Sequence, residues 1–332
     1  MNEDFEKIIH IDKPTIEKKL FARGEKQEKL FELARYVRDN GIFKNKVELR
    51  SVIEISNHCR QACRYCGIGK PESKFYMLNH QEIIKRITSL ASLGRRTFLL
   101  QSGECPKQEF IEEICLACKE VSKLYPDIKL ILCIGNLNDE QYKQLKNSGV
   151  KRYLLKFETS NPDLHKFCRP TDTFKNRLKH INRLIELGFQ VGSGNIVGLP
   201  NQTINDLIDD LILTTRLKLS MVSATKFIPN SKSEFKNYKS GDINLTLNFI
   251  ALLRILNPNC LIPSTSSLQT EDKDGQLMGL LAGCNTVTIH DGTPEEFEKN
   301  YTIYTQKRFT PSEDFCRSLI YSAKMEPEPF LI

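Results

Sequence analysis

Residues 56–67 read SNHCRQACRYCG and place three cysteines, Cys59, Cys63 and Cys66, in the spacing Cys-x3-Cys-x2-Cys. The stretch directly follows a β-branched run at 49–56, which predicts a buried strand. A structural zinc ion takes four ligands, and an ordinary four-iron cluster also takes four thiolates. The motif therefore needs either a fourth ligand from elsewhere in the chain or a use for an open coordination position.

The rest of the chain offers no convincing fourth ligand. His58 directly precedes Cys59 and is too close to it along the chain to reach the same metal. Elsewhere, cysteine in an apolar helix or strand pattern usually packs as a small hydrophobic residue. This interpretation covers four of the eleven cysteines, Cys115, Cys118, Cys260 and Cys284.

Outward from the motif, short apolar or β-branched runs alternate with amphipathic helix patterns. After 49–56, the predicted strands are 96–101, 128–134, 151–157, 189–197, 219–227, 260–264 and 284–289. The predicted helices between and after them are 80–94, 107–125, 138–149, 173–188, 202–218, 245–257, 273–283 and 311–324. Several of these helix patterns end at glycine, as helix C-termini commonly do.

Eight strand–helix pairs in one chain predict the α/β class and a (β/α)8 TIM-type barrel. We expect two parts, an N-terminal helical extension at 1–45 and the barrel with its C-terminal helix at 46–332. The alternative is a doubly wound open sheet. The segment GSGNIVG at 192–198 lacks the G-x-G-x-x-G spacing of a dinucleotide-binding loop, so this alternative is weak.

Composition narrows the function classes. The chain has 332 residues, 40% of them hydrophobic, and a net charge of +7 from 48 basic and 41 acidic side chains. The basic residues are scattered, which argues against a nucleic-acid partner. No apolar run is long enough to span a membrane, and the N-terminus lacks the order of a signal peptide. We therefore expect a cytoplasmic protein without disulfides.

The polar segments that follow the predicted strands favour a site at one end of the barrel. In such barrels the working residues lie in loops at the C-terminal ends of the strands. Besides the cysteine motif, the segments there are 101–105, 134–136, 157–161, 194–203, 226–230, 263–267 and 289–293. Each of them carries glycine or polar residues, as a site at this rim would require.

The cysteine spacing directly after the first strand, with Tyr65 before the last cysteine, resembles the signature of the radical S-adenosylmethionine superfamily. The resemblance implies a 4Fe–4S cluster bound by Cys59, Cys63 and Cys66, with one iron left open for S-adenosylmethionine. It also implies reductive cleavage of this cofactor to a 5′-deoxyadenosyl radical. The open position would then be functional.

The resemblance extends to the cofactor-binding segments. QSGE resembles the motif that faces the methionine amine, FETSNPDLHKFCRP…FKNRL the segment that contacts ribose and carboxylate, and GNIVGLP the segment along the adenine. A carboxylate accepts from ribose hydroxyls, and a guanidinium forks onto a carboxylate. The residues implied to bind the cofactor are Tyr65, Gly103, Glu104, Glu158, Arg177, Gly194, Ile196 and Gly198. Each of them alone also fits an ordinary structural role, but together they favour a cofactor site.

Within the superfamily, the chain is similar to the biotin synthase-like branch and most similar to the HydE family of FeFe-hydrogenase maturases. The segments RTFLLQSGE, RYLLKFETSNPDLHKFCRP, VGLPNQTINDLIDDL and LLRILNPNCLIPSTSS carry this resemblance. It implies a HydE-like role in H-cluster maturation. The alternatives are a methylornithine synthase-like mutase, a sulfur-inserting enzyme of the biotin or lipoyl type, and a non-catalytic iron–sulfur scaffold protein.

Two rim positions depart from the HydE pattern. Lys156 stands where that family usually has arginine, and Lys226 is a lysine that the family pattern lacks at the open end of the barrel. A cation beside several hydroxyls in a dry cavity suits an anionic group, which is costly to bury unpaired. We therefore expect a small, anionic substrate. The candidate substrate residues are Lys156, Lys226, Thr265 and Ser266. An equal alternative is that Lys156 only balances the charge of Glu158.

The resemblance further implies a reducing electron donor such as ferredoxin or flavodoxin. Cys105, Cys133 and Cys168 also lie near predicted strand ends or rim loops. We favour buried structural roles for these three cysteines. The alternative is an auxiliary iron–sulfur cluster, as in sulfur-inserting relatives.

Overall fold

A single curled parallel sheet forms the centre of the molecule. The computed structural model describes residues 12–71, 74–301, 303 and 309–332. The strands are β1 (Lys46–Ser56), β2 (Thr97–Ser102), β3 (Lys129–Cys133), β4 (Arg152–Leu154), β5 (Gln190–Val197), β6 (Met221–Lys226), β7 (Thr286–Ile289) and β8 (Glu326–Glu328). Their order is β6-β5-β4-β3-β2-β1-β7, with β8 paired to β1 outside this path. All pairs are parallel, which confirms the predicted TIM-type α/β fold.

The prediction of a strand at 260–264 is wrong in detail. This segment makes only isolated parallel bridges, Leu261 with Met221 on β6 and Pro263 with Thr286 on β7. Pro263 has no N–H to donate, so a regular ladder cannot continue through it. The segment still links the two edge strands, and β7 corresponds to the predicted strand at 284–289. The short strand β8 was not predicted, because its sequence EPE has no apolar alternation.

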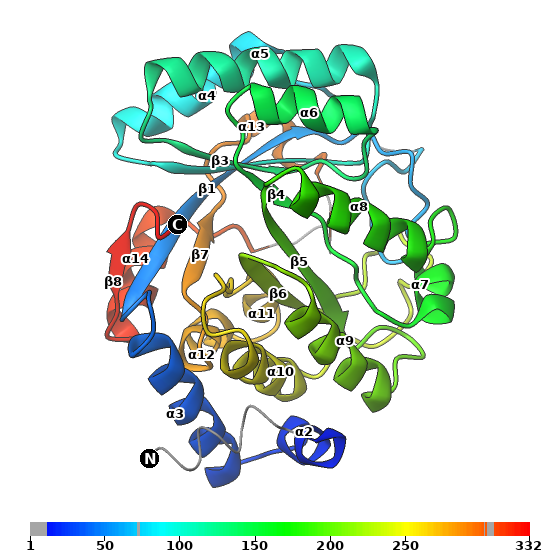
Figure 1. Ribbon diagram of the computed structural model, residues 1–332, viewed down its shortest axis with the longest axis vertical. Coiled ribbons are helices and arrows are strands. Elements are labelled where there is room, and N and C mark those ends of the chain that lie inside the picture. The colour runs from blue at the N-terminus through cyan, green and yellow to red at the C-terminus, as the bar shows by residue number, and fades with distance from the viewer. Residues whose placement is uncertain (1–11, 72–73, 302, 304–308) are drawn as a thin grey trace.

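The helices surround the sheet (Figure 1). They are α2 (Lys13–Leu20), α3 (Glu25–Asp39), α4 (His80–Ser92), α5 (Gln108–Leu124), α6 (Asp139–Asn147), α7 (Pro162–Cys168), α8 (Phe174–Glu186), α9 (Ile204–Arg216), α10 (Ile243–Leu256), α11 (Ser266–Gln269), α12 (Gly275–Leu281), α13 (Glu295–Glu298) and α14 (Glu313–Ser322). Capping boxes at Asn79, Asn138 and Thr203 fix the starts of α4, α6 and α9. Three short helices, α7, α11 and α13, were not predicted.

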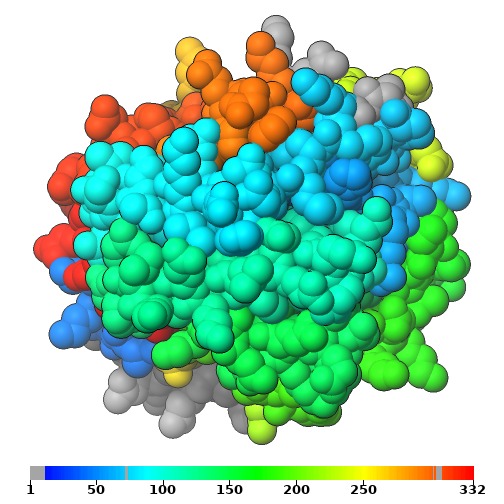
Figure 2. All heavy atoms as spheres, turned by 90° about the horizontal axis from the view of Figure 1, so that it is seen from above, coloured from blue at the N-terminus to red at the C-terminus, as the bar shows by residue number. Residues whose placement is uncertain are grey.

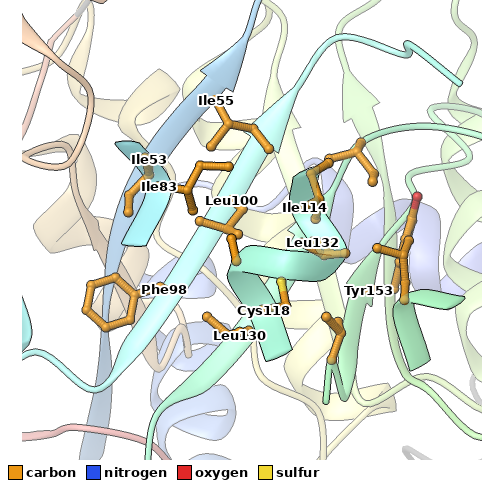
Figure 3. Close-up of a cluster of buried hydrophobic side chains, with 14 of the residues drawn as sticks. Ile53, Ile55, Ile83, Phe98, Leu100, Ile114, Cys118, Leu130, Leu132 and Tyr153 are labelled. Carbon is orange, nitrogen blue, oxygen red and sulfur yellow. The ribbon is translucent and has the colours of Figure 1, made fainter. Parts of the chain in front are cut away.

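Two large apolar clusters fill the space between the sheet and the helices. In the first, Leu100 and Leu132 on the outward faces of β2 and β3 pack with Ile114 of α5 (Figure 3). Helices α4, α5 and α6 cover this side with a continuous surface (Figure 2). In the second cluster, α2 and α3 share a core with α9, α10 and α14. The helices before β1 therefore pack directly onto the barrel.

Alternation along the strands sends the other set of side chains into the barrel. Val52, Leu99 and Ile131 form a small buried cluster there, with Leu154 and Cys133 packed against it. This cluster fills part of the interior, so open space remains at the carboxyl ends of the strands. Among the described residues, no helix combines the length and apolar character needed to cross a bilayer.

Candidate functional site

A cavity of about 340 Å³ opens among the carboxyl ends of the strands. Its volume lies within the usual range for small-ligand sites. Among the residues proposed from the sequence, those that line it are Cys59, Cys63, Tyr65, Cys66, Gly103, Glu104, Lys156, Glu158, Arg177, Ile196, Lys226 and Thr265. Gly194, Gly198 and Ser266 are not among the lining residues. The structure thus brings segments from most of the strand ends to one place.

Each sulfur of the cysteine motif has a hydrogen-bond donor beside it. The backbone N–H of Glu104 lies 3.4 Å from Cys59 Sγ, and that of Ile68 lies 3.4 Å from Cys66 Sγ. Arg169 Nη1 donates to Cys63 Sγ at 3.1 Å. Hydrogen bonds to the sulfurs are one of the features that set the potential of an iron–sulfur cluster. The loop is therefore suited to thiolates.

Two glycines allow the cysteine loop to pack closely. A Cβ at Gly69 would lie 2.8 Å from Cys59 Cβ, and one at Gly103 would lie 2.7 Å from Cys59 Cβ and 2.3 Å from His58 O. Both distances are shorter than real contacts of this kind. Gly103 therefore supports the loop by its lack of a side chain, because a larger residue would displace Cys59.

Three thiols are one ligand short of a structural zinc site and match the number of thiolates on a 4Fe–4S cluster that keeps one iron open. Among the described residues, no three His, Cys, Asp or Glu side chains converge closely enough to hold one metal ion. An iron–sulfur cluster is larger and takes one thiolate on each of three irons, so its ligands stand further apart. Burial raises the pKa of Cys66 to about 12, so this thiol stays protonated unless a metal replaces the proton.

Glu104 lies in the cavity wall, but its carboxylate forms hydrogen bonds with the chain itself. Oε1 accepts from Arg60 Nε at 2.9 Å and from Gln61 Nε2 at 2.6 Å. Oε2 accepts from the backbone N–H of Asn136 at 2.9 Å. Burial opposes ionisation of Glu104, but the charge of Arg177 and these hydrogen bonds hold its pKa below the ordinary value. Glu104 thus fixes the cysteine loop through two residues that stand between Cys59 and Cys63.

Arg177, from the second turn of α8, is almost fully buried at the cavity. Its Nη2 lies 3.2 Å from Asp172 Oδ2 and 3.6 Å from Glu104 Oε2. Within the part of the chain that the structure describes, its Nε has no hydrogen-bond partner. A buried guanidinium N–H without a partner is costly, so this atom marks a place where a ligand oxygen would be stabilised.

Glu158 follows β4 in a left-handed backbone conformation, with φ of 67°. Its Oε2 is buried and forms an ion pair with Lys156 Nζ at 3.3 Å, but it has no hydrogen bond among the described residues. Burial raises the pKa of this carboxyl, but Lys156, Arg169 and Arg177 outweigh that effect and bring it below the ordinary value. Glu158 is therefore an ionised acceptor that is available to a hydroxyl donor.

Arg169 is a site residue that sequence reasoning missed. Besides Cys63, it donates to Tyr65 Oη at 3.3 Å, and it is almost fully buried. The only sequence signal was its place in the segment FETSNPDLHKFCRP. Tyr65 itself packs against an apolar cluster that contains Ile196 and Phe227, all three of which line the cavity. These side chains form a flat apolar wall next to the cysteine loop.

Gly194 and Gly198 serve the packing of β5. A Cβ at Gly194 would lie 2.0 Å from Ser223 O on β6. Gly198 has φ of 90°, and a Cβ there would lie 2.4 Å from Gly241 Cα. The structure therefore places Ile196 at the cavity and gives the two glycines that flank it a supporting role.

Three of the four candidate substrate residues line the cavity, and Ser266 does not. Lys156 lines the cavity and donates to Thr225 Oγ1 at 3.0 Å. Lys226 also lines it, but its Nζ donates to Glu271 Oε2 at 2.6 Å, so its charge is already neutralised. Thr265 shares a 2.8 Å hydrogen bond with Ser267, and Ser266 begins α11 away from the cavity lining.

Arg50, from β1, is a second residue missed by sequence reasoning. It lines the cavity deep in the barrel and is 3% exposed. Its Nε donates to Glu48 Oε1 at 2.8 Å, while its Nη2 has no hydrogen-bond partner. An arginine inside an otherwise apolar strand, LRSVIEIS, was the available signal.

The three additional cysteines do not come together. Cys133 lines the cavity at the end of β3. Cys105 and Cys168 belong to two different apolar clusters. Burial raises the pKa of Cys168 to about 12. This separation supports structural roles for Cys105 and Cys168.

Comparison with known proteins agrees with this geometry. Residues 53–213 match the Radical SAM superfamily. The chain is 38% identical over 284 residues to the FeFe-hydrogenase maturase subunit HydE of Thermotoga maritima, covering 84% of this chain and 80% of that protein. It is 28% identical to the 3-methylornithine synthase of Methanosarcina acetivorans, covering 80% of this chain and 75% of that protein.

Solved structures share the fold. A crystal structure of methylornithine synthase (PylB) superposes with a TM-score of 0.83 at 22% identity, covering 98% of this chain and 97% of that one. The maturase HydG from Carboxydothermus hydrogenoformans gives a TM-score of 0.80 at 22% identity, covering 98% and 80%.

The barrel, the cysteine loop and these matches define a radical S-adenosylmethionine enzyme, a class that uses a 4Fe–4S cluster and S-adenosylmethionine. Within that class, the chain belongs to the HydE family.

Proposed function

We propose that Cys59, Cys63 and Cys66 hold a 4Fe–4S cluster whose fourth iron is open to S-adenosylmethionine, and that the enzyme acts in H-cluster maturation as a HydE. The observation that carries the proposal is a pair of buried groups in the cavity that also contains the three thiols: Arg177 Nε, which has no hydrogen-bond partner among the described residues, and the Glu158 carboxylate, whose Oε2 has only the ion pair with Lys156. The bound cofactors would supply an electron to cleave the sulfonium and give a 5′-deoxyadenosyl radical.

The residues beside the thiols fit the parts of S-adenosylmethionine. Glu158 is suited to accept from the ribose hydroxyls, and Arg177 to donate to the carboxylate. Tyr65 and Ile196 offer an apolar surface for the adenine. Glu104 and Gly103 hold the cysteine loop, so their contribution to the methionine amine is through the position of that loop. Gly194 and Gly198 keep Ile196 in place.

An anionic substrate fits the deeper part of the cavity. Arg50 presents an unpartnered Nη2 there, and Lys156 lies higher in the wall. Each cation can pair with a separate anionic group, because Arg50 lies on β1 and Lys156 lies in the segment after β4. Thr265 adds a hydroxyl at the same cavity. Lys226 would bind substrate only if Glu271 moved away from it.

We further propose that a small acidic electron carrier, a ferredoxin or flavodoxin, delivers the electron at the face of the cysteine loop. Arg60, Lys74 and Lys107 are exposed around this loop, and Phe75 is 43% exposed and lies 4.9 Å from the ring of His58. Exposed cations around an aromatic side chain suit an acidic protein partner. Reductive cleavage of S-adenosylmethionine requires reducing conditions. We therefore also propose a cytoplasmic location, which fits a protein whose eleven cysteines are all free.

The charge of Lys156 is tested by Lys156→Met, which keeps most of the side-chain stem. With reduced, reconstituted protein, we expect the variant to retain slow formation of 5′-deoxyadenosine without substrate and to lose the stimulation by substrate. Wild-type stimulation in the variant would show that Lys156 only balances Glu158.

The physiological role is tested by complementation of a cell that lacks its own HydE but contains the other maturases. Restoration of hydrogenase activity by the wild-type chain, and failure with Cys63→Ala, would support the proposal. Formation of methylornithine by the purified enzyme, without complementation, would assign it to the mutase group instead.

A further inference from the structure

The chain makes a sharp turn directly after β4, centred on Glu158. The backbone N–H of Thr159 donates to Phe157 O at 2.9 Å, across a single intervening residue. With φ of 67° at Glu158, this bond closes a γ-turn of the positive-φ form. That form is rare and strained, and strained turns persist only where the surrounding structure holds them.

Strand β5 holds the turn on one side. The backbone N–H of Glu158 donates to Gly194 O at 3.0 Å, and that of Ile196 donates to Glu158 O at 2.9 Å. The turn and β5 therefore position each other. This matters because Glu158 and Ile196 both line the cavity beside the cysteine loop.

Asp210 holds the same two segments from behind. It lies on α9, which packs beside β5 (Figure 1), and it is fully buried. Its Oδ1 accepts from the backbone N–H of Ser160 at 2.6 Å, and its Oδ2 accepts from Asn195 Nδ2 at 2.8 Å. One carboxyl group thus joins the loop after Glu158 to the residue before Ile196.

A second acid on the same helix face reinforces this arrangement. Asp206, one turn earlier on α9, accepts from Asn161 Nδ2 at 2.7 Å. Its other oxygen belongs to the capping box at Thr203. Asp206 therefore serves mainly the start of α9, whereas the hydrogen bonds that Asp210 accepts come from the loop and from β5.

We propose that Asp210 is a positioning residue for S-adenosylmethionine, which keeps the Glu158 carboxylate in the cavity by holding the strained turn against β5. This inference rests on the proposed function, in which Glu158 contacts the ribose. Without Asp210, the Ser160 N–H and the Asn195 amide would be buried without partners. The turn would relax, and the carboxylate of Glu158 would leave its position.

The test compares variants of Asp210 for cofactor binding. Dissociation constants are measured for S-adenosylmethionine with the anaerobically reconstituted protein, and for S-adenosylhomocysteine as a probe that gives no radical. We expect Asp210→Ala to weaken both about tenfold, because a small misplacement of a binding group is costly. Asp209→Asn is the matched control, since that neighbouring acid is exposed and pairs with Lys13. It should bind both ligands as the wild type does.

Asp210→Asn should rescue binding to within about threefold of the wild type. The new side chain can still accept from the Ser160 N–H. Its amide can donate to Asn195 Oδ1 once the Asn195 amide turns over, since Oδ1 has no hydrogen-bond partner among the described residues. If Asp210→Ala does not fold, Asp210→Ser replaces it, since serine is polar but too short to reach both donors. Weakened binding by the serine variant supports the proposal, and wild-type binding overturns it.

The decisive readout is a double-mutant cycle with Glu158→Ala. If Asp210 acts through Glu158, Asp210→Ala should add little further loss in that background. An equal loss in both backgrounds, or none in either, would overturn the inference. If Glu158→Ala alone binds the cofactor normally, then the proposed role of Glu158 is wrong, and this result separates that failure from a failure of Asp210.

Discussion

Arg177 combines two tasks in one side chain, because it balances buried carboxylates and keeps one N–H free. Asp172 and Glu104 hold its Nη2, while Nε has no partner. Glu158 is an ionised carboxylate whose Oε2 pairs with Lys156 but has no hydrogen bond among the described residues. Unsatisfied buried groups are rare in folded proteins, so two of opposite charge in one cavity indicate a ligand that carries both a donor and an anionic group.

Arg177→Ala should weaken binding of S-adenosylmethionine about ten- to a hundredfold, because a hydrogen bond to a charged group contributes about 1.5–3 kcal/mol. Iron content should not change, since the loop keeps its hydrogen bonds from Arg60 and Gln61 to Glu104. Calorimetric titration and iron analysis of the same sample measure both quantities. Arg183→Ala, an exposed position on the same helix, is the control. Normal affinity in Arg177→Ala would mean that the carboxylate contact lies elsewhere.

The cysteine loop depends on its contact with the end of β2. Gly103→Ala would place a Cβ 2.3 Å from His58 O, and the loop would have to move. We expect this variant to retain the barrel but to take up much less iron than the wild type during reconstitution. Gly94→Ala is a suitable control, because Gly94 has φ of 88° but nothing within 4 Å of an added Cβ. It should lose some stability and no iron. Full iron uptake by Gly103→Ala would contradict the supporting role of Gly103.

Helix α9 carries an acid whose protonation is coupled to folding. Burial raises the pKa of Asp210 to about 7 from an ordinary value of 3.8, and the negative charge of Asp206 acts in the same direction. Between these values the unfolded chain is ionised at this position and the folded chain is protonated. The contribution of Asp210 to stability is therefore present below about pH 4 and is lost as the pH rises to about 7.

Asp210→Asn removes this contribution, so the melting temperature of the variant should fall less than that of the wild type between pH 5 and pH 7. Both proteins should show similar slopes above that range. Thermal melts across the range, on protein without cofactor, measure the difference between the two curves. Parallel curves throughout would show that Asp210 does not change its protonation in this interval.

For the molecule as a whole, the sequence predicted the order of strands and helices and the end of the barrel that carries the site. The cysteine motif, Glu158 and Ile196 were predictable because each lies in a short segment at a strand end. The prediction of a regular strand at 260–264 was wrong because Pro263 interrupts the hydrogen-bond ladder. Arg50 and Arg169 were missed because their significance depends on which buried atoms they meet across the barrel.

The orientation of Glu104 also could not be predicted. Its place in QSGE indicated the cavity, but its partners Arg60 and Asn136 come from two other loops. Likewise, Lys226 was correctly placed at the cavity, while its pairing with Glu271 depends on the loop before α12. Local patterns therefore identify the rim, and only the packed barrel determines which of its groups remain free for a ligand.

The central claim is that the cysteine loop holds one 4Fe–4S cluster with an iron open to S-adenosylmethionine. The most direct measurement is the electron paramagnetic resonance spectrum of the reduced, reconstituted protein before and after addition of S-adenosylmethionine, with iron counted in the same sample. We expect about four irons per chain and a spectrum that shifts when the cofactor binds. We expect neither the four irons nor the spectral shift from the triple variant Cys59→Ala, Cys63→Ala, Cys66→Ala. A signal unchanged by S-adenosylmethionine, or a cluster retained in the triple variant, would contradict the account.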